Sequence, residues 1–74
     1  MEALQFQLRD EYIELYKLLK VTGVCESGGG AGALITSGSV KVDDQVELRK
    51  GRKIRGGQVV KTSRAKITVL GMAG

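Results

Sequence analysis

Residues 14–42 read ELYKLLKVTGVCESGGGAGALITSGSVKV, and this stretch decides the fold. Apolar residues at positions 12, 15, 16 and 19 follow the i, i+3, i+4, i+7 spacing of an amphipathic helix. Gly23 stands where a glycine commonly closes a helix. The start of the helix has two interpretations: Asp10 caps a longer helix, or the helix begins at Glu14 after an extended segment at 11–13. We predict the later start.

A second helix is predicted after Ser27, whose hydroxyl can accept a backbone N–H bond as an N-cap. Positions 31, 34 and 35 share its apolar face, and Gly38 ends it. The glycines at 28, 29, 30 and 32 oppose this helix, because a glycine inside a helix costs ~1 kcal/mol relative to alanine. Either packing of Leu34 and Ile35 holds a marginal helix, or the glycines admit the close approach of another backbone or of a phosphate.

Beyond Gly38 the apolar period changes to that of strands. Residues 40–42 and 46–48 alternate apolar and polar on either side of Asp43 and Asp44, which predicts a hairpin. A turn at 56–57 precedes a strand at 58–62, and a second turn separates it from a strand at 65–70. Alternation over residues 4–8 adds an N-terminal strand. The predicted fold class is α+β, with two short helices packed on a small antiparallel sheet or barrel.

The composition narrows the classes of function. Seventy-four residues build one small core, so we expect a single domain over residues 1–74, with a frayed tail at 71–74. Because the chain has no histidine, it lacks the commonest catalytic base and metal ligand, and we expect no enzyme activity, no metal and no cofactor. Cys25 is expected to be a small buried apolar side chain. No apolar run is long enough to span a bilayer, and the N-terminus lacks a signal peptide. We therefore expect a cytoplasmic monomer without membrane contacts.

The net charge of +4 is unevenly distributed. Residues 1–38 hold three basic and five acidic residues, a net −2, whereas residues 39–74 hold nine basic and three acidic residues, a net +6. Five of those cations lie within seven residues, RKGRKIR at 49–55. Such a density repels itself unless a polyanion or solvent screens it.

The basic run predicts phosphate recognition, because three of its cations are arginines, whose planar guanidinium binds phosphate through two hydrogen bonds. Phe6, Tyr12 and Tyr16 are expected to lie in the core or near the N-terminus, away from the cations. Without aromatic side chains for stacking bases, recognition of the RNA backbone and shape is favoured over recognition of bases.

Three other patterns have structural explanations. The glycine run at 28–33 matches a dinucleotide-binding fingerprint, but a helix precedes it and a hairpin follows it, so the parallel-strand context is missing. Gly56-Gly57-Gln58 spells the tripeptide with which release factors hydrolyse peptidyl-tRNA, and here it is interpreted as a turn. The carboxylates of the second half, Asp43, Asp44 and Glu47, are interpreted as a turn and a solvent-facing strand position, with no polar neighbour placed to shift their pKa values.

The segment 13–60 resembles the S4 RNA-binding domain, also called the αL motif, and is similar in particular to its small stand-alone bacterial members. The residues that carry the resemblance are the helix ELYKLLK (14–20), the step ESGG (26–29), the strand VKVD (40–43) and the run RKGRKI (49–54). The resemblance implies that the helix pair and the following strand form the RNA-binding surface. From it and from the basic run, the residues expected to contact RNA are Lys20, Ser27, Lys41, Arg49, Lys50, Arg52, Lys53 and Arg55.

Two departures from the family pattern bear on affinity. Where relatives have alanine-lysine on the second helix, this chain has Ala31-Gly32, so one cation is missing. Asp44 stands where relatives have the hairpin glycine, and it adds a negative charge.

We expect a module that binds structured RNA, such as ribosomal RNA or tRNA, without catalysis, and this requires the basic run, Lys20 and Lys41 to share one face. The alternative is a protein-interaction module whose basic run docks on an acidic partner, such as a ribosomal or stress protein.

Overall fold

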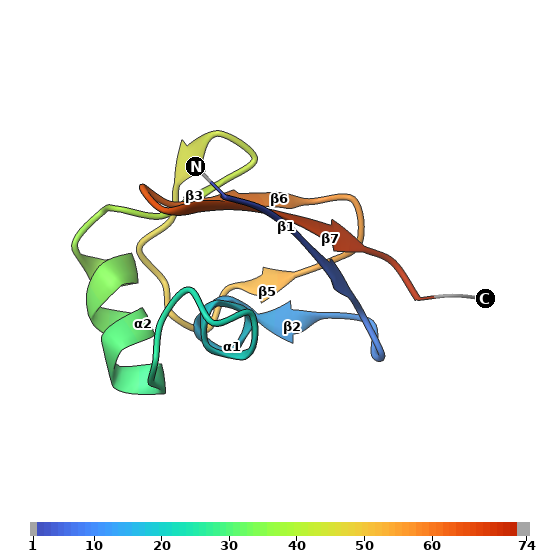
Figure 1. Cartoon of the computed structure of the whole chain (residues 1–74), viewed down its shortest axis with the longest axis horizontal. Coiled ribbons are helices and arrows are strands. Elements are labelled where there is room, and N and C mark those ends of the chain that lie inside the picture. Colours follow the sequence, from blue (N-terminus) through green and yellow to red (C-terminus); the bar gives the residue numbers. More distant parts are fainter. Residues whose placement is uncertain (1, 73–74) are drawn as a thin grey trace.

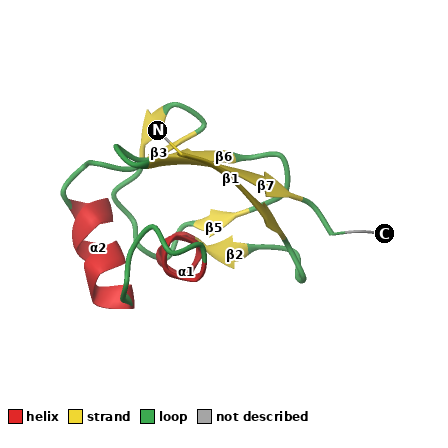
Figure 2. Ribbon diagram, in the orientation of Figure 1, coloured by secondary structure: helices red, strands yellow, loops and turns green. Residues whose placement is uncertain are grey.

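The computed structural model describes residues 2–72, arranged as Figures 1 and 2 show. In chain order the elements are β1 (Glu2–Gln7), β2 (Ile13–Glu14), α1 (Leu15–Val21), α2 (Gly28–Thr36), β3 (Lys41–Val42), β4 (Gln45–Val46), β5 (Lys53–Ile54), β6 (Val59–Lys61) and β7 (Ala65–Leu70). Of the tail predicted to fray, the last two residues lie outside the described residues. Within residues 2–72, no helix has the length and apolar content to cross a membrane.

Five strands form one sheet in the order β1-β7-β6-β3-β4, and β2 pairs with β5 in a separate two-stranded sheet. The predicted α+β fold and its N-terminal strand are confirmed. That strand makes the large sheet mixed, because β1 runs parallel to β7 with Leu4 opposite Ile67, whereas the other pairs in the sheet are antiparallel. Parallel pairing needs a long connection, and here the rest of the domain connects the first strand to the last.

Both helices lie on one side of the five-stranded sheet (Figure 1). The core fills the space between them with apolar side chains that are almost fully removed from water. Its largest members are Leu15, Leu18 and Leu19 of α1, Ile35 of α2, Val40, Val60, Ile54, Ile67 and Val69. The opposite face of the sheet is open to solvent, since alternate residues of β7 are buried and exposed.

The helix boundaries follow the predicted signals. Helix α1 begins at Leu15, directly after the extended pair of β2, so the later of the two predicted starts is confirmed. Gly23 and Gly38 follow the two helices with φ of +82° each, the left-handed conformation that a closing glycine adopts. The Ser27 hydroxyl accepts the backbone N–H of Gly30 at 3.0 Å, which confirms the predicted N-cap of α2.

The β3–β4 hairpin turns on Asp43 and Asp44, whose φ angles are +50° and +68°. Two successive positive φ values are typical of the two-residue type I′ turn. This turn places Val42 opposite Gln45 and Lys41 opposite Val46. Because Val42 faces the core, the register sends Val46 to the outside, where it is 53% exposed.

Gly56-Gly57-Gln58 forms a turn, as predicted. Gly57 has a φ of +89°, and a β-carbon on Gly56 would stand 2.5 Å from the Cα atom of Gly71. The Gln58 side chain closes the turn, because its Oε1 accepts the backbone N–H of Arg55 at 2.8 Å and its Nε2 donates to the Asp43 carboxylate at 3.1 Å.

Candidate nucleic-acid interface

The basic loop, which we define as residues 49–55, lies against the start of α1. The backbone N–H of Leu15 donates to the Arg52 carbonyl at 2.8 Å, and that of Tyr16 donates to the Lys50 carbonyl at 3.1 Å. These amides have no partner within their own helix. At the far end of the loop, Ile54 pairs with Ile13 in the two-stranded sheet. Two sets of hydrogen bonds therefore hold the loop backbone against the helix.

Glu47, which directly follows β4, anchors two arginine side chains of the basic loop. It is 9% exposed, and its carboxylate accepts the backbone N–H and the Nε–H of Arg49 at 3.1 and 3.0 Å and an N–H of Arg52 at 2.8 Å. The side-chain bond from Arg49, more than offsetting the effect of burial, lowers the pKa of Glu47 from 4.5 to about 2, and the other two bonds act in the same direction.

The prediction that Glu47 faces solvent, without polar neighbours that shift its pKa, was wrong. The cause is the hairpin register, since the Glu47 N–H donates to the carbonyl of Val40, a core residue. A residue paired with Val40 points to the same side of the sheet. Leu48, the apolar neighbour of Glu47, is left 55% exposed.

Two of the three arginines of the loop are therefore partly neutralised, since Arg49 and Arg52 share one carboxylate. The Arg49 side chain is still 73% exposed and that of Arg52 34% exposed. Together with Gly51 and Lys53 they line an open hollow of about 510 Å³. The hollow presents guanidinium and ammonium groups to solvent, which is the donor set that binds phosphate oxygens.

The Lys50 side chain does not line the hollow formed by Arg49, Arg52 and Lys53. It extends from the loop across α2 instead. Its Cδ atom lies 2.7 Å from the position that a β-carbon on Gly32 would occupy. Lys50, Tyr16 and Gly28 line a small hollow of about 190 Å³. The glycine at position 32 therefore admits a side chain of this same protein, rather than the backbone or phosphate that the sequence suggested. Helix α2 contains no basic residue of its own, and Lys50 brings the stem of a loop cation to its side.

Aromatic rings do lie among the cations, which corrects the prediction that they would not. The Lys53 ammonium stands 4.9 Å from the centre of the Tyr12 ring, and the Arg55 guanidinium stands 5.7 Å from it. Tyr12 precedes β2, which pairs with β5, so the two-stranded sheet brings the ring to these cations. Tyr12 is 38% exposed and leaves part of its ring open to a ligand.

Lys20 and Ser27 lie where the two helices meet. Lys20 is exposed in the last turn of α1, four residues after Tyr16, and residues four apart share one side of a helix. The Ser27 oxygen is engaged as the cap of α2. As an acceptor in that bond, the hydroxyl keeps its hydrogen for donation to a further group.

Lys41 projects from the other side of the five-stranded sheet. Its neighbour Val42 is 5% exposed and faces the core, so Lys41 faces away from the helices. The basic loop contacts α1 on the helix side (Figure 1). The structure thus does not place Lys41 on the face that carries the basic loop.

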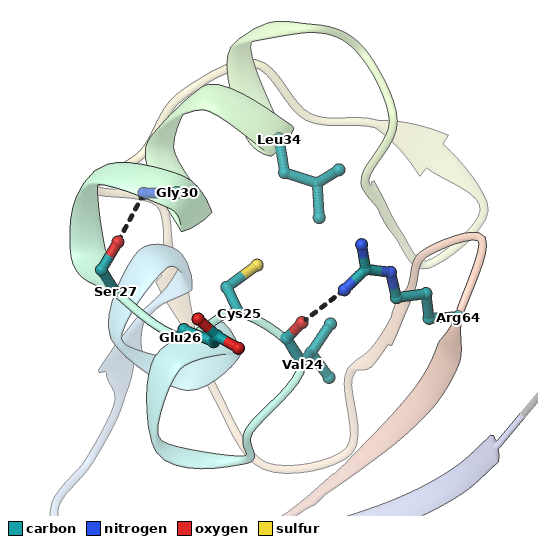
Figure 3. A pocket seen from close by; sticks show the side chains of 7 residues that line it. All are labelled: Val24, Cys25, Glu26, Ser27, Gly30, Leu34 and Arg64. Atoms are coloured by element: carbon teal, nitrogen blue, oxygen red, sulfur yellow. Dashed lines mark hydrogen bonds between the residues drawn. The ribbon is translucent and has the colours of Figure 1, made fainter.

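A further hollow, of about 300 Å³, lies between the α1–α2 connection and the turn before β7 (Figure 3). Cys25, predicted as buried, is half-buried and points its sulfur into this hollow. The Arg64 guanidinium donates to the Val24 carbonyl at 3.4 Å, and Glu26 adds a carboxylate to the lining. Arg64 is the one cation among the residues that line this hollow, and it is bonded to a carbonyl and shares the hollow with the Glu26 carboxylate. The hollow is therefore less suited to an anion than the basic loop.

A comparison with known protein families identifies the family of this fold. The model of the S4 domain family matches residues 6–70, from β1 to the end of β7. The chain belongs to the S4 domain family. The resemblance seen in the sequence is therefore confirmed, and it extends beyond segment 13–60 to the first and last strands of this S4 domain.

Two proteins that are similar in sequence to this chain are both called YbcJ. The protein from Escherichia coli (strain K12), whose name describes it as a candidate RNA-binding protein, and that from Shigella flexneri are each 51% identical over 49 residues, 66% of this chain and 70% of theirs. The solution structure of YbcJ from E. coli superposes with a TM-score of 0.70 at 42% identity and covers 89% of this chain and 85% of that one. That structure is described as revealing an αL motif involved in RNA binding.

The sequence did not indicate that Glu47, Tyr12 and Tyr16 lie beside the cations of the candidate interface. Tyr16 was expected in the core as part of the apolar face of the first helix, and the structure places it beside Gly28 and Lys50. The role of Glu47 depends on the register of the β3–β4 hairpin. The role of Tyr12 depends on the pairing of β2 with β5, strands that are far apart in the sequence, and no local pattern indicates that pairing.

Proposed function

We propose that this S4 domain binds folded RNA of the ribosomal RNA or tRNA class, without catalysis. The domain contacts the phosphate backbone of the RNA. The observation that carries the proposal is the fixed backbone of the basic loop, bonded to the first turn of α1 through Leu15 and Tyr16. Cations held in place before binding lose less conformational entropy when a ligand arrives. The description of E. coli YbcJ as an αL protein involved in RNA binding supports the same function.

Within this proposal, each loop cation has a defined place. Arg49 and Arg52 offer the guanidinium hydrogens that Glu47 leaves free, and Lys53 and Arg55 present their charges beside the Tyr12 ring. Lys50 carries its charge across α2 toward the helix junction. There Lys20 supplies a further cation, and the Ser27 hydroxyl donates to a phosphate oxygen.

Affinity in this proposal comes from charge. Cations that neutralise phosphates release counterions, so log affinity falls linearly with log salt. If about four phosphates are neutralised, the slope is roughly −3 to −4. Shape selection comes from the fixed loop and helices, and Tyr12 and Tyr16 offer two rings against which an unpaired base can stack.

The test measures the affinity of a structured RNA and of a single-stranded RNA for the wild type and for Lys50→Gln/Lys53→Gln. Neither lysine makes a hydrogen bond to a carboxylate in the described residues, so the variant is expected to fold normally, as circular dichroism will check. We expect the structured RNA to bind more tightly than the single strand, and the variant to lose affinity for it. Equal binding by variant and wild type would exclude the basic loop as the RNA site.

A second candidate function, docking on an acidic protein, is favoured by one observation. Leu48, which is 55% exposed, directly precedes the basic loop, and Val46, which is 53% exposed, lies two residues earlier on the outer face of the sheet, where it pairs with Lys41. Val46→Thr/Leu48→Thr removes this apolar surface and leaves every loop cation in place. If the variant keeps its affinity for RNA and loses a protein partner that co-purifies with the wild type, the basic loop serves protein docking.

A further inference from the structure

Three lysines lie side by side on the outer face of the five-stranded sheet. Lys41 of β3 pairs with Lys61 of β6, and Lys61 pairs with Lys66 of β7. Paired residues on neighbouring strands point to the same side, and neighbouring strands are about 5 Å apart. The lysine row, as we name these three residues, thus extends over about 10 Å across the sheet.

The lysine row is not required by the fold. Like charges directly opposite each other on a sheet are destabilising, and the row contains two such pairs. The core is built on the other face, by the residues that alternate with these lysines. Lys41 and Lys66 are exposed, and 37% of the Lys61 side chain is open to solvent.

The Asp44 carboxylate bonds one of the three ammonium groups and interacts with the other two only through their charges. Asp44 accepts a hydrogen bond from Lys61 at 2.8 Å. That bond and the charge of Lys61 hold the pKa of Asp44 below its usual range, and the charges of Lys41 and Lys66 act in the same direction. The nearby Asp43 carboxylate bonds the backbone N–H of Val59 and the side chain of Gln58 instead. Two of the three positive charges are left without a bonded carboxylate in the described residues.

The row of residues next to the lysines carries no charge. It consists of Val59, Thr68 and Gln5, which pair in register across β6, β7 and β1. At the β3 end of this row, Asp43 and Asp44 line a hollow with Val59, Lys61 and Lys66, and the Asp43 carboxylate is occupied by its bonds from Val59 and Gln58. An anionic polymer laid across the lysine row finds the Thr68 hydroxyl and the Gln5 amide beside it as hydrogen-bond donors.

The basic loop and the lysine row face in opposite directions. The loop contacts α1, which lies below the sheet in the view of Figure 1. The lysines of the row are directed away from the helices, because each is next in its strand to a core residue, Val42, Val60 or Ile67. The domain measures 35 × 22 × 22 Å, and the two surfaces lie on opposite sides of it. A single straight RNA duplex can therefore contact only one of the two surfaces at a time.

We propose that the lysine row is a second RNA-binding surface, which contacts the phosphates of a different RNA segment from the one on the basic loop. The inference rests on the proposed function for the identity of its ligand. The exposed Val46, which pairs with Lys41, borders one end of the row. RNA is favoured over an acidic protein because the row itself is a line of ammonium groups, and cations in such a line neutralise neighbouring phosphates of a nucleic-acid backbone. Ammonium groups bind phosphates as point charges, and phosphate contacts position a protein on RNA without reading its sequence. The domain thus holds two RNA segments together.

The test is a bridging experiment with one short RNA stem-loop, prepared in donor-labelled and acceptor-labelled forms. Energy transfer between the two forms, at limiting protein, reports that one chain holds two RNA molecules. The variants are Lys41→Gln/Lys66→Gln in the lysine row and Lys50→Gln/Lys53→Gln in the basic loop, with folding checked by circular dichroism. Asp44→Asn removes the carboxylate and keeps a residue type that tolerates the positive φ of the turn.

We expect the wild type to bridge, both lysine variants to bind one RNA without bridging, and Asp44→Asn to bridge at higher salt than the wild type. The inference is overturned if the wild type binds one RNA and the lysine-row variant binds it equally well, a result that leaves the basic loop intact as a site. It is also overturned if the lysine-row variant bridges as the wild type does, or if it loses only the binding of a poly-glutamate peptide. Absence of RNA binding by the wild type would refute the proposed function itself.

Discussion

The Cδ atom of Lys50 lies 2.7 Å from the point where a β-carbon on Gly32 would stand. The two residues come from different parts of the chain, the basic loop and the middle of α2, and the loop cation crosses the helix only because position 32 has no side chain. A glycine that looks unfavourable within its own helix thus sets the direction of a charged group on another element.

Gly32→Ala is therefore expected to separate stability from binding. Alanine raises helix propensity by up to about 1 kcal/mol, while its methyl group displaces the Lys50 stem. RNA affinity should fall roughly two- to fivefold, as expected for the loss of a contact worth up to about 1 kcal/mol. Thermal unfolding and a binding titration measure the two effects.

Gly29→Ala is the matched control, because a β-carbon there would meet only the Ser27 oxygen, at 4.0 Å. It adds the same methyl group to the same helix and should leave RNA affinity unchanged. A similar loss of affinity in both variants would show that Lys50 is not the cause.

Glu47→Gln should destabilise the domain by about 1–3 kcal/mol, because the hydrogen bonds from Arg49 and Arg52 lose their charged acceptor. Glutamine keeps the shape of the side chain, so the effect reports the charge. Urea unfolding at neutral pH measures it, and a variant as stable as the wild type would show that the anchor contributes nothing.

The pH dependence of stability follows from the same residue. The folded-state pKa of Glu47 is lowered from 4.5 to about 2, so its contribution is complete above pH 4.5 and is lost as the pH falls from 4.5 toward 2. The difference in unfolding free energy between wild type and Glu47→Gln should shrink across that window. A difference that stays constant across this pH range would show that the ion pairs of Glu47 with Arg49 and Arg52 do not stabilise the folded state.

Ser27→Ala should cost about 0.5–2 kcal/mol, because it removes the N-cap of a helix that is rich in glycine. Ser27→Asp keeps a capping oxygen and should restore stability, while its negative charge lowers RNA affinity. If Ser27→Asp bound RNA as tightly as the wild type, this end of α2 would lie outside the interface.

Gly56→Ala should destabilise the domain by about 1–3 kcal/mol, because the new β-carbon would stand 2.5 Å from the backbone of Gly71. Gly51→Ala is the comparison, since its nearest neighbour would be a Glu14 oxygen at 3.5 Å, an ordinary contact. Equal stability of the two variants would show that the turn at 56–58 tolerates a side chain.

Local signals were sufficient for the helices and the hairpin. The Ser27 cap, the closing glycines at 23 and 38 and the turn at Asp43 and Asp44 all lie where the sequence predicted them. Each depends on a few neighbouring residues, whose conformational preferences act over one or two turns of chain.

The parts that the sequence did not predict depend on how the strands pair and in which register. Glu47 was expected in solvent because its apolar neighbours Val46 and Leu48 look like core residues. The turn at Asp43 and Asp44 fixes the opposite register, which exposes Val46 and Leu48 and buries Glu47. The parallel partner of β1 and the Tyr12 ring beside Lys53 likewise follow from which strands meet, and no local pattern specifies this.

The measurement that tests the central claim most directly is the slope of log affinity against log salt for a structured RNA, with the wild type and with Lys50→Gln/Lys53→Gln. For the wild type we predict a slope of roughly −3 to −4, and for the variant a slope shallower by roughly 1.4 to 1.8, since two phosphate contacts are removed. A wild-type affinity that does not change with salt, or two equal slopes, would contradict the account.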